Sequence, residues 1–249
     1  MNRLNHPILH NRIAIWCVAF ILLWCASARI TSAATPCLRP NDELWIVSTR
    51  HLGCPNGSPP ALRVRYLNPV AGWQVADVSS LVERTSDDRM CVVYVHGNRL
   101  ERDEVTQNVW DMYRCLTLGQ PDAPPMRFIT WSWPSGKRGG ILKDVRAKAS
   151  RTEFDGYYLG WFLSQLPEDR PLRLVGYSFG ARIVTGASHL LGGGQLSGRT
   201  LDEEVMQQSQ PVESRPRVVL MAAATHSHWL RPGCYHEKAL HRIGSLLNI

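Results

Sequence analysis

A series of short apolar runs constrains the fold of this chain more than any other sequence feature. These runs alternate with segments whose apolar residues have the spacing of a helix. The clearest run is Cys91–Val95, which ends at His96-Gly97. Continuous apolar runs of this length fit strands that are covered on both faces, the usual state of a parallel sheet. Other strands are expected at 127–131, 172–175 and 217–222, and helices at 101–118, 142–166 and 181–191. Alternating strands and helices predict an α/β fold with a mostly parallel sheet and helices on both of its faces.

Both ends of this core carry further expected strands. Residues 43–49 and 62–67 are expected to be strands, and the second alternates apolar and basic residues as a half-exposed edge strand does. The polar stretch 195–216 is expected to be a surface excursion. Residues 245–249 have the pattern of the start of another strand, so we expect the sheet to lack its last strand or strands.

The amino-terminal segment has the pattern of a secretory signal. Arg3 and Arg12 precede the apolar run 13–26, and small residues follow at Ser32-Ala33-Ala34. This order predicts a signal peptide over residues 1–34, cleaved after Ala34, and a single mature domain over 35–249. The run is short for a membrane span, which needs about 20 residues. We therefore expect an exported protein, with membrane anchoring by an uncleaved signal as the alternative.

Charge and cysteine content narrow the partners and the compartment. The formal net charge of the 249 residues is +7, and three arginines but no acid lie in the predicted signal, so the mature domain would carry +4. A net charge this small gives no reason to expect a nucleic-acid partner. Five cysteines remain after the signal, and an oxidising compartment then allows two disulfides at most. Cys37 and Cys54 are the first pair expected, whereas Cys91 is expected to be a small core residue.

The sequence Gly176-Tyr177-Ser178-Phe179-Gly180 is the strongest indication of chemistry. It is a G-x-S-x-G motif, and it stands between an apolar strand and an amphipathic helix, where a nucleophile elbow must lie. The turn is so sharp that only small residues fit two positions before and after the serine. We therefore expect Ser178 to be a nucleophile and Gly176 and Gly180 to be the glycines that the elbow needs.

The segment His96-Gly97-Asn98 lies one strand–helix unit earlier and suits the second part of such a site. An oxyanion hole combines the amide of the residue after the nucleophile with an amide from the loop after an earlier strand. The expected donors are the backbone amides of Phe179 and Asn98. The ring of His96 is expected to close the end of its strand and to take no part in proton transfer.

Three motifs together make the chain resemble a known group. Tyr94–Asn98, Ser132-Trp133-Pro134-Ser135 and Gly176–Gly180 resemble the α/β-hydrolase superfamily. More narrowly, the chain is similar to a bacterial branch of serine hydrolases, the domain-of-unknown-function 900 type, from about Trp45 to its last residue. The resemblance implies an ester, thioester or amide hydrolase, or an acyltransferase. It also implies a small-molecule or lipid-like acyl substrate and no metal or cofactor.

The expected catalytic triad is incomplete in this sequence. The superfamily order is serine, then an acid, then a histidine after the last strand, and the usual places for the acid and the final histidine are absent. The loop after the strand at 217–222 instead contains His226 and His228.

Three interpretations stay open. In the first, His226 or His228 is the base. Its orienting acid would then be Glu237, Asp202 or Glu203. In the second, the chain keeps the fold without catalysis and serves as a binding module. In the third, the sequence is that of a truncated gene product, which the apolar run 246–249 favours.

Other histidines and charged residues have simpler interpretations. His189 is expected on the surface or in packing, and His236 and His241 on a solvated face. His226, His228 and His236 would be an unusual zinc site, since no cysteine or carboxylate has a matching spacing, so no metal is expected. The stretch 137–151 contains six basic residues around Asp144. It is expected to be a solvated helix face, with weak attraction to a membrane or another anionic surface as the alternative.

Overall fold

The computed structural model describes residues 38–249, apart from 86, 88, 138, 168–169 and 202–214 and the side chains of 141–143. The predicted signal at 1–34, Cys37 of the expected disulfide, and the possible acids Asp202 and Glu203 lie outside the described residues. None of the helices in the described part of the chain is long and apolar enough to cross a membrane.

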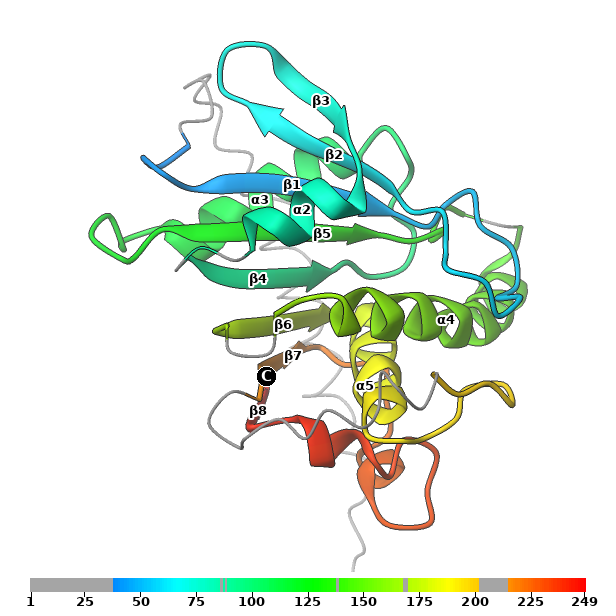
Figure 1. The fold of residues 1–249 in the computed structure, drawn as a ribbon. Helices are drawn as coiled ribbons and strands as arrows, with labels where there is room; N and C mark the ends of the chain where they lie inside the picture. The colour runs from blue at the N-terminus through cyan, green and yellow to red at the C-terminus, as the bar shows by residue number, and fades with distance from the viewer. Residues whose placement is uncertain (1–37, 86, 88, 138, 168–169, 202–214) are drawn as a thin grey trace, which may run out of the picture. The chain divides into compact units, whose positions relative to one another are not determined.

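The described residues form an α/β fold around one mixed sheet, shown in Figure 1 from β3 at the top to β8 at the bottom. Its eight strands are β1 (Glu43–Ser48), β2 (Arg63–Asn68), β3 (Gly72–Ala76), β4 (Met90–Val95), β5 (Met126–Ser132), β6 (Leu172–Tyr177), β7 (Arg217–Met221) and β8 (Ser245–Asn248). Their order is β3-β2-β1-β5-β4-β6-β7-β8. Neighbours from β1 to β8 are parallel, and β2 and β3 add an antiparallel edge. The expected mostly parallel α/β sheet is therefore confirmed.

Helices cover both faces of this sheet. They are α2 (Val78–Arg84), α3 (Val105–Thr117), α4 (Ile141–Ser164) and α5 (Phe179–Leu191), followed by the short 3-10 helices η2 (Ser227–Leu230) and η3 (Ala239–Arg242). Buried residues of α2, α4 and α5 share one apolar core with one face of the sheet. Buried residues of α3 share a second core with the opposite face. The sheet thus separates two cores, which explains why its central strands are apolar on both sides.

The chain reverses its direction across the sheet at β4. From β4 it passes through α3 to β5 on one side, and from β5 it crosses through α4 to β6 on the other side. The two crossover helices therefore lie on opposite faces. In open parallel sheets such a reversal leaves a crevice at the carboxyl ends of the strands, and ligands bind there. The ends of β4 and β6 carry the two motifs expected to form the site.

Several local expectations needed correction. The strand β3 and the helix α2 were not predicted, and the expected helix at 101–118 begins only at Val105. His236 is buried rather than solvated, with 2% of its surface exposed. The expected start of a strand at 245–249 is confirmed as β8, and Cys91 is buried in the core as predicted.

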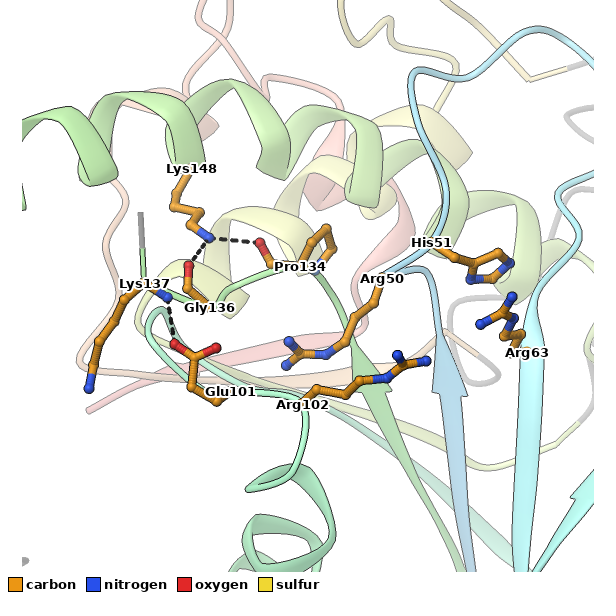
Figure 2. A pocket seen from close by; sticks show the side chains of 9 residues that line it. All are labelled: Arg50, His51, Arg63, Glu101, Arg102, Pro134, Gly136, Lys137 and Lys148. Carbon is orange, nitrogen blue, oxygen red and sulfur yellow. Dashed lines mark hydrogen bonds between the residues drawn. The ribbon is translucent and has the colours of Figure 1, made fainter. Parts of the chain in front are cut away.

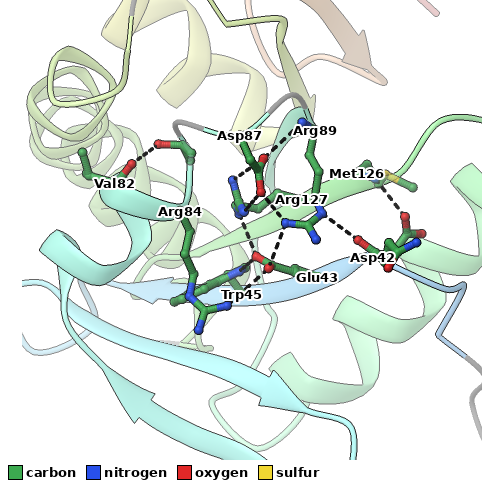
Figure 3. Close-up of polar contacts among 11 residues, drawn as sticks. Asp42, Glu43, Trp45, Val82, Arg84, Asp87, Arg89, Met126 and Arg127 are labelled. Carbon is green, nitrogen blue, oxygen red and sulfur yellow. Dashed lines mark hydrogen bonds and ion pairs between the residues drawn. The ribbon is translucent and has the colours of Figure 1, made fainter.

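A buried ion-pair cluster lies at the opposite, amino-terminal edge of the sheet (Figure 3). The guanidinium of Arg127, at the start of β5, is 1% exposed. Its Nε donates to Glu43 at 2.8 Å and its Nη2 to Asp87 at 2.9 Å. Because a buried charge is costly unless it is paired, this cluster ties β1, β5 and the turn before β4 together on the side of the sheet remote from the motifs.

Candidate active site

Ser178 has a backbone conformation that non-glycine residues rarely adopt. It lies between the last residue of β6 and the first residue of α5, with φ +51° and ψ −115°. Its amide donates to the carbonyl of Met221 at 2.9 Å, and its carbonyl accepts from Ala181 at 3.1 Å. These bonds hold the serine in place against a local strain of about 1–3 kcal/mol. The G-x-S-x-G segment is therefore a sharp strand-to-helix turn with the serine at its centre.

The two glycines of the motif are required by close packing. A methyl group on Gly176 would lie 2.7 Å from Cα of Ala181, and one on Gly180 would lie 2.0 Å from the carbonyl oxygen of Val95. Both obstacles are backbone atoms, which cannot rotate away. The absence of these side chains lets α5 start directly against β6 and β4. The turn is therefore built by the residues that the sequence singled out.

Substitution of Ser178 by glycine is expected to raise the free energy of unfolding by about 1 kcal/mol. Glycine adopts a positive φ without strain, and the relief exceeds the roughly 0.5–1 kcal/mol lost through the greater freedom of the unfolded chain. Urea denaturation followed by circular dichroism measures the change. Ser178→Ala is the matched control, because alanine keeps the strained backbone and should not gain this amount. Equal stabilities of the two variants would contradict stored strain at this position.

The loop after β4 lies directly against Ser178. A methyl group on Gly97 would lie 3.2 Å from Cβ of Ser178 and 2.9 Å from the ring of Tyr177. The ring of His96 is 1% exposed and stacks on Trp133, with ring centres 5.9 Å apart. Burial lowers the pKa of His96 to about 3, so the ring is neutral at physiological pH. These contacts place the loop backbone, rather than the imidazole, beside the serine.

Asn98 is held by a buried acid that the sequence did not identify as part of the site. Its Nδ2 donates to Asp144 of α4 at 3.1 Å. The guanidinium of Arg99 lies 3.7 Å from the same carboxylate oxygen, and the side chain of Asp144 is 1% exposed. The one signal in the sequence is that Asp144 stands alone among six basic residues. The expected solvated face at 137–151 is thus wrong for Asp144 and Lys148, which are both buried.

His226 and His228 lie on a loop that is attached to the serine turn. The amide of Ala224 donates to the carbonyl of Ser178 at 3.1 Å, so the loop begins next to the candidate nucleophile. Both imidazoles are exposed, and they stack on one another with ring centres 5.2 Å apart. In the described part of the chain, neither ring makes a hydrogen bond with the Ser178 hydroxyl. The loop that carries the two histidines therefore lies at the site, but no hydrogen bond between Ser178 and either histidine is formed.

An aromatic–cationic stack fixes the position of this loop. Arg182 of α5 lies over the ring of Trp229 at 4.7 Å and over the ring of Phe179 at 5.5 Å. The ring of Trp229 is in turn 5.6 Å from that of His226. Because the amide of Phe179 is the second expected oxyanion donor, the stack links that end of α5 to the histidine loop. Stacking of this kind contributes about 0.5–1 kcal/mol or more per contact.

The other late histidines have structural surroundings. His236 accepts or donates one hydrogen bond with the hydroxyl of Thr185 at 2.9 Å, and burial lowers its pKa to about 3. His189 is 6% exposed and lies between the amides of Gln195 and Lys238. The carboxylate of Glu237, one of the expected orienting acids, accepts from the amide of Gly233 at 2.6 Å. Within the described ranges, no three His, Cys, Asp or Glu side chains converge on a possible metal position.

Comparisons with known proteins add no relative to this description. No protein-family model, curated protein or solved structure matches the chain.

Proposed function

We propose that the chain is an exported serine hydrolase of the α/β-hydrolase type that cleaves an ester, thioester or amide bond. Ser178 would attack the acyl carbonyl, and the amides of Asn98 and Phe179 would stabilise the developing oxyanion. The acyl group would then be released from Ser178 to water. His226 or His228 would accept the serine proton and return it to the leaving group.

One observation carries this proposal above the others. Ser178 keeps a positive φ at a turn where glycine would cost less, and the chain holds it there with backbone hydrogen bonds. Four other described non-glycine residues also have a positive φ, but Ser178 alone combines it with a place in the G-x-S-x-G turn between β6 and α5, where backbone strain is typical of a reactive group. The proposal is supported by the nearness of the Gly97 loop to Ser178 and by the start of α5 at Phe179, because oxyanion donors come from a loop and a helix start of this kind.

Labelling of the purified full chain with a fluorophosphonate probe tests the proposal. These probes react with activated serines, so we expect one covalent adduct, which intact-mass analysis detects and which Ser178→Ala abolishes. His226→Ala and His228→Ala are compared separately, and the variant that lacks the base should label at least about 100-fold more slowly. His241→Ala is the matched control, since His241 is also an exposed histidine of the carboxyl-terminal region.

A folded chain that takes up no probe would contradict the proposal. The same holds for labelling that survives Ser178→Ala. Labelling that is lost in Ser178→Ala but unchanged in both histidine variants would keep the nucleophile and reject the assigned base.

A binding module is the second candidate function. It is favoured by one observation, that the Ser178 hydroxyl makes no hydrogen bond to a histidine within the described residues. In that case the same turn would bind an acyl-like ligand without cleaving it. Absence of labelling together with retained binding of an ester would support this alternative.

A further inference from the structure

A cavity of about 440 Å³ opens at the carboxyl edge of the sheet, next to β1 and β5 (Figure 2). Its charged lining consists of Arg50, Arg63, Arg102, Lys137, Lys148 and one acid, Glu101. These residues come from the loops after β1, β4 and β5, from the first position of β2, and from α4. The fold therefore assembles three arginines and two lysines around one concave space.

Among the described residues, none of the three cavity arginines Arg50, Arg63 and Arg102 forms an ion pair with an acid, although the charges of Glu101, Asp155 and Asp103 act on Arg50 from nearby. The carboxylate of Glu101 accepts from the backbone amide of Lys137 at 2.7 Å instead of pairing with a guanidinium. The guanidiniums of Arg63 and Arg102 make neither an ion pair nor a hydrogen bond with any described residue. Arg63 and Arg102 are exposed, whereas Arg50 is half-buried, and several charges of one sign around a concave space attract an ion of opposite charge.

Arg50 is the most firmly placed of the three arginines. Its Nε donates to the hydroxyl of Ser132 at 2.8 Å, and its Nη2 donates to the carbonyl of Leu100 at 2.9 Å. These partners are neutral, so they orient the guanidinium without cancelling its charge. Burial lowers the pKa of Arg50; Glu101 opposes this effect and the positive charge of Arg102 adds to it. An anion in the cavity would offset the repulsion between Arg50 and Arg102.

A groove of about 610 Å³ with a partly aliphatic wall adjoins the cavity. The three arginines Arg50, Arg63 and Arg102 line both spaces. About half of the remaining wall of the groove is aliphatic, including Leu62 and Val64, and the rest is polar, including the charged residues Arg65 and Asp103. A ligand held by the arginines could therefore place an apolar part in the groove.

We propose that this cavity is a binding site for a phosphate-type oxyanion, held by Arg50, Arg63 and Arg102. A guanidinium presents two parallel N–H donors to a phosphate. Several guanidiniums together match the double negative charge of a phosphate better than the single negative charge of a carboxylate. The phosphate can be free or can be the head of an amphiphile whose chain enters the groove. In both cases the recognised chemistry is the same.

The site lies on the same edge of the sheet as Ser178 but is separate from it. Three strand spacings separate β1 from β6 in the sheet order, which corresponds to roughly 14 Å. Binding of the oxyanion requires no chemistry at Ser178. If the ligand were also the acyl substrate, an idea that rests on the proposed hydrolase function, its phosphate and its cleaved bond would be separated by roughly 14 Å.

Isothermal titration calorimetry of the purified full chain in a phosphate-free buffer tests the site. The two probes are inorganic phosphate and monomeric decyl phosphate. We expect both to bind, and we expect Arg63→Gln with Arg102→Gln to weaken each of them by about tenfold or more. Arg114→Gln with Arg217→Gln is the control, because it removes the same charge at exposed positions away from the cavity. Ser178→Ala should bind like the unmodified chain.

The two probes distinguish the source of the phosphate. Decyl phosphate that binds at least tenfold more tightly than inorganic phosphate would assign an amphiphilic ligand, and equal affinities would assign a free or polar phosphate. Either result supports the site if the cavity variant loses affinity. Absence of binding by both probes, or equal loss in the cavity variant and the control, would overturn it. A failure of serine labelling would leave these results unchanged.

Discussion

Replacement of Gly180 by alanine is expected to destabilise the chain by about 4 kcal/mol or more, a large fraction of the roughly 5–15 kcal/mol that stabilises a typical native protein. The added methyl group would lie 2.0 Å from the carbonyl oxygen of Val95 and 2.9 Å from that of His96. These atoms belong to the end of the central strand β4, so relief requires α5 to move away from the sheet. Urea denaturation followed by circular dichroism measures the loss.

Gly53→Ala is the control for this substitution. A methyl group on Gly53 would have no atom within 4 Å, and its φ is outside the positive region. The change should therefore alter the free energy of unfolding by less than about 1 kcal/mol. If Gly180→Ala cost no more than this control, the contact between α5 and β4 could not be as close as the structure has it.

Replacement of Arg127 by methionine is expected to lower the free energy of unfolding by about 3 kcal/mol. The substitution keeps the length of the side chain but leaves Glu43 and Asp87 without their buried partner. Removing one member of a buried pair costs about 3–5 kcal/mol, and the lower end applies because both carboxylates keep some contact with water. Arg84→Met is the control, since Arg84 is 53% exposed and its ion pair with Glu43 is 3.4 Å long. Arg84→Met should lower the free energy of unfolding by less than about 1 kcal/mol.

The same cluster makes the stability of the chain depend on pH, and the sign of this dependence follows from the pKa shifts of its acids. Desolvation raises the pKa of both acids, but the Arg127 hydrogen bonds and the other contacts outweigh it. The folded pKa of Glu43 is thus below its ordinary 4.5, and that of Asp87 is below its ordinary 3.8. Their contribution is complete above these ordinary values and is lost as the pH falls through the lower folded values. Thermal unfolding between pH 6 and pH 3 should show a smaller decrease for Arg127→Met than for the unmodified chain; parallel curves would contradict the assignment.

The central strands could be predicted because both of their faces are buried. Cys91–Val95 is therefore a continuous apolar run and Leu172–Val175 is an apolar run interrupted only by Arg173, and the structure confirms them as β4 and β6. The strand β3 has no such signal, because it is an edge strand whose Val75 is 86% exposed. The helix α2 has seven residues, of which only Leu81 is buried, so it lacks a detectable apolar stripe.

The serine turn could also be predicted, because its packing requires small residues at fixed positions close to it in sequence. The surroundings of the site could not. His236 is buried by a contact with Thr185, 51 positions earlier, and Asn98 is held by Asp144, 46 positions later. The cationic cavity likewise draws Arg50, Arg63 and Arg102 from separate loops and strands. Such contacts depend on the sheet order, which periodicity along the chain does not specify.

The spacing of four charged residues on α4 has a consequence for how the two sites can move. Asp144, Lys148, Arg151 and Asp155 recur at helical intervals, and all of them face loops at the carboxyl edge of the sheet. Asp144 bonds to Asn98, Lys148 to the carbonyls of Pro134 and Gly136, and the last two to the segment that follows β1. The helix α4 therefore fixes the positions of three loops relative to one another. Because these bonds join α4 to the lining of the cationic cavity and to Asn98, we expect any displacement of α4 to shift both places together.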